Sequence, residues 1–508
     1  MCRSEAPQSI RVHRFLSLGF ALVALVGTGV ARDAGHTDFT VVAYNLENLF
    51  DVDGFALYDD YLQDEANDPY AYTRHKLLTK LVNARRVLAQ FNSGTGPEII
   101  LFQEFEADFS AEGSALTDAA FLQTYAHTTV EAMLTDAWQP AYADISAIHW
   151  LLKALADVGM TGYQVAHSPA QPVSNEIAHT NAVFSKYPIL AAKSHALHRA
   201  RALLEVEIDV AGHTLVVFNN HWKSGASNRR LETVRVRNAQ ELRRLFEARF
   251  AANPEADVLI GGDLNSHYNH SRLFPKLRTG INDVLGAQGD ETFATADLYN
   301  FWYELPPEER YSEVWRGRRG SLMHLIASPG LYDSNGISYI DGSFDRCLLP
   351  GVNADAIGRP LRWNFAGQSG GGSSDHFPIF ARFSTRPFTA TGELSREKEV
   401  PSVALPLVAT GHPALGELED GAFLSELNEA DYGDYVGRLY RVKATLVQLR
   451  PLQIRLGAVI WSAYAVDKEM LGPAGLPSYL ATNEGRVELA VKLTIYRGRK
   501  QLMIEAIL

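Results

Sequence analysis

Runs of consecutive apolar residues recur through most of the chain, and they are separated by stretches in which apolar residues return every three or four positions. Four runs are too uniformly apolar for strands with one face in water, so they predict buried strands. These runs are 39–44, 98–102, 214–218 and 257–260, with two further strand candidates at 312–328 and 377–383. The spaced apolar residues predict helices over 73–91 and 229–250. Strands separated by helices indicate an α/β domain.

Three segments depart from this pattern in composition. Residues 107–162 are rich in Ala and Leu and predict a helical insertion within the α/β domain, whose bounds we place at 38–386. Residues 387–401 are rich in Pro, Ser, Thr and charged side chains, which predicts a linker. Strand-like runs with few helical stretches fill 402–508, so this part is predicted to be a small β-barrel-like domain. The order of its runs resembles an oligonucleotide-binding (OB) barrel.

The N-terminus has the order of zones found in secretory signal peptides. Arg11 and Arg14 precede an apolar run over 15–30, and small residues then lead into a polar stretch. We therefore expect residues 1–31 to be removed and the mature protein to be secreted or periplasmic. An uncleaved anchor is the alternative, but the run is short and contains several glycines, which makes it a poor membrane span. No later segment predicts a stable span.

The composition limits the number of domains and the possible disulfides, but it does not indicate a function. A chain of 508 residues with 46% hydrophobic residues suggests two domains, or one large domain with a smaller module. The net charge of -12 gives no overall basic surface for nucleic acid, although the charge around one cleft matters more than the sum. Removal of the signal peptide would leave Cys347 as the one cysteine, so an internal disulfide is excluded. Nothing in the sequence implies an obligate protein partner.

Polar motifs adjoin the apolar runs at five places. The motifs are Asn45-Leu46-Glu47, Gln103-Glu104, Asn219–Ser224, Gly261–Asn265 and Ser374–Pro378. Strand ends on a rigid sheet bring side chains together at one rim, where ligands usually bind. Each motif alone also has an ordinary explanation, because Asn and Asp favour turns and exposed charges often follow strands. Histidine after a buried strand, as at His221, can likewise simply end the sheet. The five together favour an active-site rim.

These residue types suit phosphoester hydrolysis. A hard cation needs carboxylate and amide oxygens, and the candidates for that role are Asn45, Glu47, Glu104 and Asp375. A base must activate water, which Asp263 can do if Asn265 orients it. Negative charge on the phosphoryl oxygens calls for hydrogen-bond donors, and His221 and His376 are the candidates.

In this order the motifs resemble those of the endonuclease/exonuclease/phosphatase superfamily, which includes deoxyribonucleases, abasic-site endonucleases, inositol-polyphosphate phosphatases and bacterial sphingomyelinases. The match extends over about 39–384 and includes the run Asn181–Ile189, which is similar to the family's strand ending in S-[RK]-Y-P. The resemblance implies a four-layer α/β sandwich with two central β-sheets and bound Mg²⁺ or Mn²⁺. It places Asn45, Glu47, Glu104 and Asp375 at the metal and the histidines on the phosphate, with Asp263 and Asn265 orienting the attacking water.

One position departs from the family pattern. Met323 stands where the family commonly has an Asp that hydrogen-bonds the final His. Without that carboxylate we expect His376 either to be less basic or to be held by another acid. The change affects the expected rate more than the reaction class.

The leading functional prediction is a secreted metal-dependent phosphodiesterase, in particular an endonuclease acting on DNA or RNA, because His221–Ser224 resembles extracellular bacterial nucleases. A phosphodiesterase or phosphatase for lipid headgroups or inositol phosphates is the alternative enzyme, since it uses the same metal chemistry. A binding protein that kept the fold and lost turnover is the non-enzymatic alternative, and Met323 is its one support.

Overall fold

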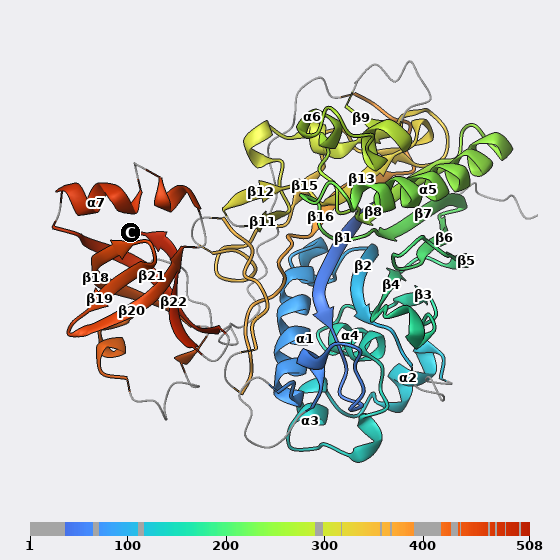
Figure 1. Cartoon of the computed structure of the whole chain (residues 1–508). Coiled ribbons are helices and arrows are strands. Elements are labelled where there is room, and N and C mark those ends of the chain that lie inside the picture. The colour runs from blue at the N-terminus through green and yellow to red at the C-terminus, as the bar shows by residue number, and fades with distance from the viewer. Residues whose placement is uncertain are drawn as a thin grey trace, which may run out of the picture. The chain divides into compact units, whose positions relative to one another are not determined.

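The structure is a computed structural model (Figure 1). It describes residues 36–63, 71–109, 116–289, 298–315, 317–355, 358–365, 368–390, 418–427, 435–436, 438–465, 468–472, 475–482, 484–496 and 499–508. The predicted signal peptide, 1–31, lies outside these residues, as does the part of the predicted linker after residue 390. No helix in the described residues is long and apolar enough to cross a membrane.

The first main sheet combines strands from both ends of the α/β domain. Its order is β14 (Ser338–Tyr339), β16 (Ile379–Ser384), β1 (Asp38–Leu49), β2 (Ile99–Glu106), β4 (His179–Ser185) and β3 (Gln164–His167), with β15 (Asp345–Arg346) also paired to β16. The central strands β1 and β2 are parallel, while β16 runs antiparallel to β1. The strands predicted at 39–44, 98–102 and 377–383 are all present in this sheet.

The second main sheet is built from the middle of the chain. Its order is β5 (Ile189–His195), β6 (Leu203–Val210), β7 (His213–His221), β8 (Asp257–Asp263), β13 (Met323–Ala327), β10 (Leu298–Asn300) and β9 (Ala287–Gln288). Strands β7 and β8 are the runs predicted at 214–218 and 257–260, and they are parallel. The candidate at 312–328 is instead three short strands, because β11 (Glu313–Trp315) and β12 (Arg318–Gly320) form a separate pair before β13.

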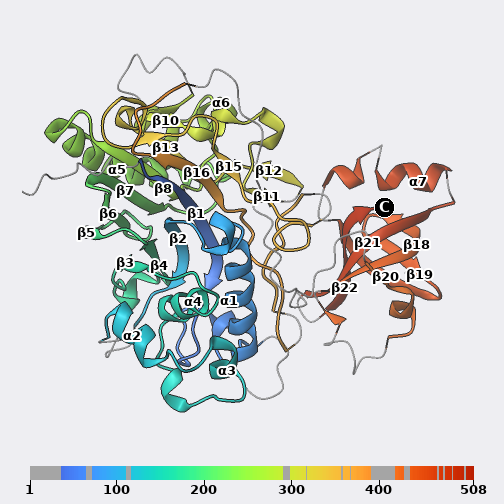
Figure 2. The ribbon, with the colours of Figure 1, turned by 180° about the vertical axis from the view of Figure 1, so that it is seen from behind.

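The apolar faces of the two sheets share one core. Val41 and Ile99 of the first sheet pack in the same buried cluster as Leu259 and Leu325 of the second. Helices α1 (Arg74–Leu88) and α4 (Ala147–Ala156) cover the other face of the first sheet, and α5 (Glu232–Ala252) covers the second (Figures 1 and 2). The predicted α/β fold with two main sheets is therefore confirmed.

Shorter helices complete this part of the chain. Helices α2 (Asp118–Thr124) and α3 (Val130–Leu134) precede α4 within the stretch predicted to be helical, and α6 (His270–Leu273) follows β8. Helices α2, α3 and α4 begin with Thr117, Thr129 and Ser146, whose hydroxyl oxygens each accept a hydrogen bond from a backbone N–H of the first turn.

The C-terminal part is a small closed β-barrel, as predicted. Its strands follow the order β18 (Leu439–Leu449), β19 (Leu452–Leu456), β20 (Val459–Ala465), β22 (Arg499–Ile507) and β21 (Arg486–Tyr496), and pairing of β21 with β18 closes the circuit. The short strand β17 (Glu419–Asp420) adds to β18, and α7 (Leu476–Thr482) lies between β20 and β21 in the chain. Its core includes Tyr440, Ile454 and Leu489, all fully buried.

Candidate active site

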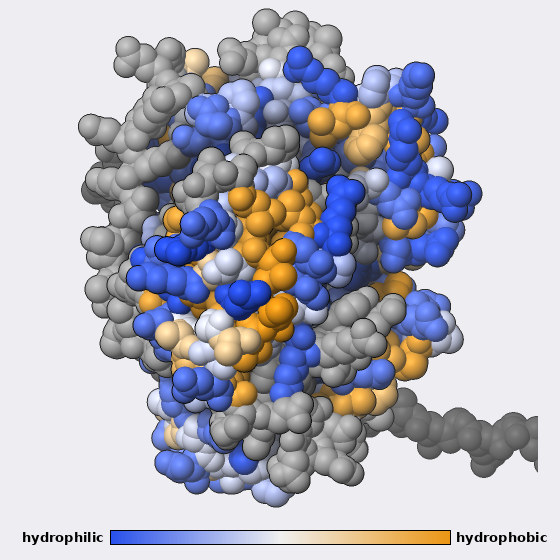
Figure 3. Space-filling model, turned by 60° about the vertical axis from the view of Figure 1, so that its left-hand side comes forward, coloured by the Kyte–Doolittle hydropathy of each residue, from blue (hydrophilic) through white to orange (hydrophobic). Residues whose placement is uncertain are grey.

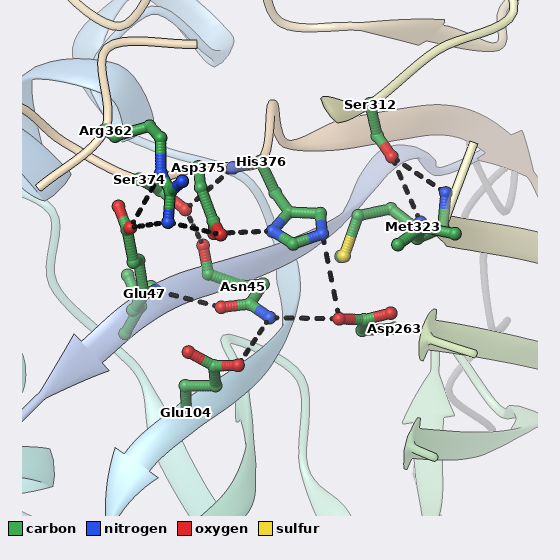
Figure 4. A network of polar contacts seen from close by, with 12 residues as sticks. Asn45, Glu47, Glu104, Asp263, Ser312, Met323, Arg362, Ser374, Asp375 and His376 are labelled. Atoms are coloured by element: carbon green, nitrogen blue, oxygen red, sulfur yellow. Dashed lines mark hydrogen bonds and ion pairs between the residues drawn. The ribbon is translucent and has the colours of Figure 1, made fainter. Parts of the chain in front are cut away.

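Four strand ends bring polar side chains together where the two sheets face each other (Figure 4). Asn45 of β1 and Glu104 of β2 come from the first sheet, while His221 of β7 and Asp263 of β8 come from the second. The Asn45 amide donates to Glu104 Oε1 at 3.1 Å and to Asp263 Oδ2 at 3.2 Å. A single amide therefore ties the carboxylates of both sheets together.

Local irregularities in the strands aim these side chains. The pairing of β2 with β4 shifts register between Phe102 and Phe105, and Glu104 within this bulge has φ 66°. The β1–β2 pairing also shifts register after Asn45, and Glu47 there has φ 46°. Left-handed backbone is uncommon for non-glycine residues and is concentrated at functional sites. A bulge turns a side chain away from the regular alternation, which is what places Glu104 on the rim.

A glycine allows Asp263 to reach the same point. Gly262 has φ 113°, and a Cβ atom there would clash with the backbone carbonyl of Asn220 on β7. The following Asp263 accepts a hydrogen bond through Oδ1 from the backbone N–H of Asn265 at 2.8 Å, which fixes its carboxylate. Asn265 therefore holds the Asp263 carboxylate through its backbone N–H.

Glu104, His221 and Asp263 together fit a metal ion. One ligand atom of each lies within 4.8 Å of the others, and His221 Nε2 is 3.5 Å from Glu104 Oε1 and 3.7 Å from Asp263 Oδ2. Burial raises the pKa of both carboxyls, and the charge of Asp375 adds to the effect at Glu104. A divalent cation would offset that cost, and carboxylate oxygens and an imidazole nitrogen are both donors that proteins offer to divalent cations.

The loop before β16 adds the third side of the site. Ser374 donates its hydroxyl to the carbonyl oxygen of Asn45 at 2.7 Å, which fixes the loop to β1. His376 follows, with Nδ1 2.7 Å from Asp375 Oδ1 and Nε2 3.7 Å from Asp263 Oδ2. Burial lowers the pKa of His376, but the neighbouring carboxylates, Asp375 first, outweigh burial and raise it well above its usual value.

The expectation of a less basic His376 is therefore wrong, and the other alternative, a different acid, holds. The reason is that Asp375 itself bonds the ring, so the carboxylate is the adjacent residue and not one on β13. Met323 is fully buried on β13, paired with Asp263 in the ladder to β8, and Figure 4 shows its side chain directed toward the imidazole. It is an apolar wall beside the ring.

Glu47 faces a cation that the sequence did not reveal. Its Oε1 accepts from both Nε and Nη2 of Arg362, at 3.2 and 3.0 Å, and its Oε2 accepts from the Trp363 backbone N–H at 2.5 Å. Arg362 Nη2 also lies 3.4 Å from Asp375 Oδ2 (Figure 4). Burial, with a further contribution from Asp375, raises the pKa of Glu47 to about 7 even with this partner. Arg362 thus neutralises the two predicted metal ligands that lie outside the Glu104 group.

Supporting residues come from outside the motifs, as with Lys80, and from within them, as with Asn219. Lys80 of α1 is buried and donates to the carbonyls of Leu46 and Glu47, both at 2.7 Å. Asn219 donates to the Phe102 carbonyl at 3.0 Å and accepts from Gln103 at 2.7 Å, so it connects the two sheets behind the site. Neither Lys80 nor Arg362 has a local sequence signal, because both reach the site only through tertiary packing.

The pKa values of the two histidines are shifted in opposite directions. Burial lowers the pKa of His221 well below its usual value, and the nearby Arg201 and His179 add to the effect. The rings of His221 and His179 are nearly parallel, with centroids 6.5 Å apart, and Arg201 lies 3.0 Å from His179 Nδ1. The surroundings of His221 thus favour the neutral imidazole, whereas those of His376 favour the imidazolium, and such a division is typical of catalytic sites.

Comparison with known proteins agrees with these motifs. Residues 175–385 match the endonuclease/exonuclease/phosphatase family, a stretch that contains His221, Asp263 and His376 but not Asn45 or Glu104. Solved structures that match the chain include TDP2 from C. elegans, at 14% identity over 68% of this chain and 75% of that chain with a TM-score of 0.36. Others are endonuclease/exonuclease/phosphatase family proteins from Leptotrichia buccalis (11% identity, 68% and 98% coverage, TM-score 0.37) and Bacteroides thetaiotaomicron (12%, 72% and 99%, 0.36). No curated protein gives a significant match.

Proposed function

We propose that this chain, which carries a domain of the endonuclease/exonuclease/phosphatase family, is a divalent-metal-dependent phosphodiesterase and that its substrate is a nucleic acid. The observation that carries the proposal is the convergence of Glu104, His221 and Asp263 within 4.8 Å, with Asn45 bonded to both carboxylates. Three chain segments and two sheets contribute to this cluster. A structural role alone does not require buried acids at φ values that cost backbone strain.

The donor set fits Mg²⁺ or Mn²⁺. Glu104 and Asp263 would hold the ion with His221. Asn45 is bonded to both carboxylates, and Asp375 holds His376, whose Nε2 lies 3.7 Å from Asp263 Oδ2. When bound, such an ion neutralises the buried carboxylates and polarises a phosphoryl oxygen. The role of Glu47 is then the ordering of Arg362, since both of its carboxylate oxygens already accept hydrogen bonds.

The chain's own side chains divide the proton transfers. Asp263 would face the ion through Oδ2 and orient the attacking water, because the Asn265 N–H fixes its Oδ1. His376, held in its charged form by Asp375, donates to a phosphoryl or leaving-group oxygen. His221, which is neutral, contributes its ring nitrogen as a ligand or acceptor.

The finer features of the fold belong to the same proposal. We assign the α/β part, residues 38–386, to the four-layer sandwich of the family. We assign residues 402–508 to the OB class. The barrel strands β18 to β22, numbered one to five in chain order, pair in the circuit one-two-three-five-four, and strands three and five are parallel. Of its aromatic residues, Tyr464 is 43% exposed on β20, and Ile460 on the same strand is 49% exposed. An exposed aromatic ring is a surface on which a base can stack. Figure 3 shows one face of the protein, on which a group of apolar residues is bordered by hydrophilic ones.

One assay panel tests the proposal. Purified protein with Mg²⁺ or Mn²⁺, and with EDTA as a control, is incubated with plasmid DNA, single-stranded RNA, sphingomyelin vesicles and inositol phosphates. We expect cleavage of DNA or RNA that EDTA abolishes. Cleavage of sphingomyelin or inositol phosphates alone would move the protein to the alternative substrate class. No metal-dependent turnover of any substrate would favour the binding-protein alternative.

Export is a separate part of the proposal. The basic, apolar and small-residue zones of 1–31 support removal of this segment and a secreted or periplasmic protein. N-terminal sequencing of protein collected from the periplasm or medium tests it. A mature species that begins at Met1 would contradict removal.

A further inference from the structure

The β11–β12 hairpin is attached directly to the catalytic loop. Glu313 of β11 forms a backbone bridge with His376, and the Phe377 N–H donates to the Ser312 carbonyl at 2.7 Å. The Ser312 hydroxyl in turn accepts from the N–H groups of Leu322 and Met323, both at 3.1 Å (Figure 4). The hairpin base is thus fixed by backbone bonds both to the loop of His376 and to β13. Any group on the hairpin is held at a constant distance from the reacting centre.

The hairpin tip is aromatic and basic. Trp315 is a large aromatic side chain that is 51% exposed. It pairs across the hairpin with Arg318, so the two side chains project on the same face. Arg318 is exposed, while the neighbouring Arg319 is engaged with the Glu308 carbonyl at 2.8 Å. The chain has a net charge of -12, so a pair of neighbouring arginines is a local exception to its overall negative charge.

Arg362 connects this tip to the catalytic residues. Its guanidinium lies 5.6 Å from the centre of the Trp315 ring, and the same group contacts Glu47 at 3.0 Å and Asp375 at 3.4 Å. The indole is therefore separated from the candidate metal ligands by one side chain. Half of the Arg362 side chain, 48%, is exposed, so a ligand can contact the guanidinium and the indole together.

We infer that Trp315, Arg318 and Arg362 form a subsite for a single nucleic-acid strand, in which a base next to the scissile phosphate stacks on Trp315 and the flanking phosphates contact the two arginines. The inference rests on the proposed function, and it narrows the substrate from nucleic acid in general to an unpaired strand. An aromatic platform beside guanidinium groups is the arrangement by which proteins bind unpaired strands. The arginines supply the charge complementarity, because each phosphate of a strand carries one negative charge.

The test compares a polymer with a substrate too small to reach the hairpin. The kcat/KM of wild type, Trp315→Ala, Trp315→Phe and Arg318→Ala is measured on a single-stranded oligonucleotide and on bis(p-nitrophenyl) phosphate. Loss of one stacked base should raise KM for the oligonucleotide about tenfold in Trp315→Ala, while Trp315→Phe keeps most of the affinity. The small diester should be cleaved at wild-type rate by all four proteins. Leu190→Ala, which removes an apolar residue that is 55% exposed on β5, is the matched control and should change neither substrate.

A binding measurement separates the two possible partners. With Glu104→Gln, which we expect to be inactive, oligonucleotide affinity is measured against salt concentration, alone and combined with Arg318→Ala. Removal of one phosphate contact should reduce the slope of log affinity against log salt by about one. Binding to phosphatidylcholine–phosphatidylserine vesicles is measured in parallel with Trp315→Ala. If that substitution weakens vesicle binding and leaves the oligonucleotide unaffected, the subsite is a membrane contact and the inference is wrong.

Failure of the inference is distinct from failure of the proposed function. If wild type cleaves neither the oligonucleotide nor the small diester, the proposed function fails. If wild type cleaves both and Trp315→Ala leaves the oligonucleotide KM unchanged, the proposed function is supported and the inference of a subsite is wrong.

Discussion

Strands β1 and β2 carry two groups of acidic residues whose surroundings differ sharply. Glu47 and Glu104 lie in the candidate site, where Arg362, His376 and an amide face the carboxylates. Asp51 follows β1, and Glu106 is only two residues beyond Glu104 on β2. The second group is bonded mainly by backbone: the Asp51 N–H donates to Glu106 Oε2 at 2.9 Å, and Glu106 Oε1 is buried with no hydrogen-bond partner among the described residues.

The difference appears in the pKa values. Burial, increased by the Asp51 charge, raises the pKa of Glu106 to about 10, whereas the pKa of Glu47 rises only to about 7 because Arg362 and Lys80 oppose the rise. The two groups have similar residue types and similar burial, but cations oppose the raised pKa at Glu47 and are not among the main influences on Glu106. A nearby cation favours the charged form of a buried carboxylate. The candidate site thus favours ionised acids more than the surroundings of Glu106, where burial and Asp51 favour the neutral form.

The largest expected effect is on catalysis. Glu104→Gln removes a candidate metal ligand and should lower kcat/KM on a phosphodiester by at least about 100-fold, as loss of a ligand normally does. Its overall fold should be retained, since the amide is close in size to the carboxyl group. Steady-state kinetics with Mn²⁺ measure the change, and circular dichroism checks the fold. Activity of Glu104→Gln within threefold of wild type would remove Glu104 from the ligand set.

Glu106→Gln is the matched substitution on the same strand, and it should act on stability instead. Because the folded-state pKa of Glu106 is raised above its ordinary value of 4.5, the folded protein binds more protons than the unfolded chain between about pH 5 and 10. Stability is therefore lost as pH rises through that window. The glutamine amide still offers an oxygen that accepts from the Asp51 N–H, but it ionises in neither the folded nor the unfolded state. Glu106→Gln should therefore stabilise the protein by about 1–3 kcal/mol at pH 9.

Denaturant unfolding at pH 5 and pH 9 measures that difference, which should be near zero at the lower pH. Activity on the phosphodiester should stay within about twofold of wild type, since Glu106 lies outside the site. Equal stability of the two proteins at pH 9, or stabilisation of wild type by added Ca²⁺ that Glu106→Gln abolishes, would show that Glu106 is ionised.

The smallest effect is expected at the other end of the strand that carries Asp263. Asp257 begins β8 and accepts one hydrogen bond, from the Ile337 N–H at 2.7 Å, while its Oδ1 has no partner among the described residues. Burial raises its pKa to about 8. Wild type should therefore lose stability as the pH rises from about 4 to 8, and Asp257→Asn should not. At pH 8 the variant should be more stable than wild type by about 1 kcal/mol, after allowance for partial hydration of the carboxylate. The thermal midpoint measured from pH 5 to 8 tests it, and parallel curves for both proteins would contradict the assignment.

Sequence reasoning succeeded where the signal is local. Uniform apolar runs at 39–44 and 257–260 specify buried strands, and the short motifs that end them contain Asn45, Glu104 and Asp263. The family match begins at residue 175, so the motifs at Asn45 and Glu104 rest on the residues themselves and on their resemblance to the family pattern. Single strands of the barrel are harder to bound from sequence: the five residues of β19 alternate between buried and exposed, a pattern too short to separate from a loop.

What failed depends on packing between distant segments. Arg362 meets Glu47 across 315 residues of sequence, and no pattern around either residue announces the pair. Of the two alternatives for His376, the structure supports the one in which another acid holds the ring, and the sequence pattern did not indicate that this acid is the adjacent Asp375. Trp315 gave no signal, because an exposed indole looks like a core residue until its surroundings are known.

The most direct test of the central claim is metal-dependent hydrolysis of bis(p-nitrophenyl) phosphate by wild type and Glu104→Gln, with and without EDTA and added Mn²⁺. The site as described predicts turnover by wild type that EDTA abolishes and Mn²⁺ restores, and almost none by Glu104→Gln under any of these conditions. Equal turnover by the two proteins, or wild-type turnover that survives EDTA, would contradict a metal-dependent phosphodiesterase built on the Glu104, His221 and Asp263 cluster.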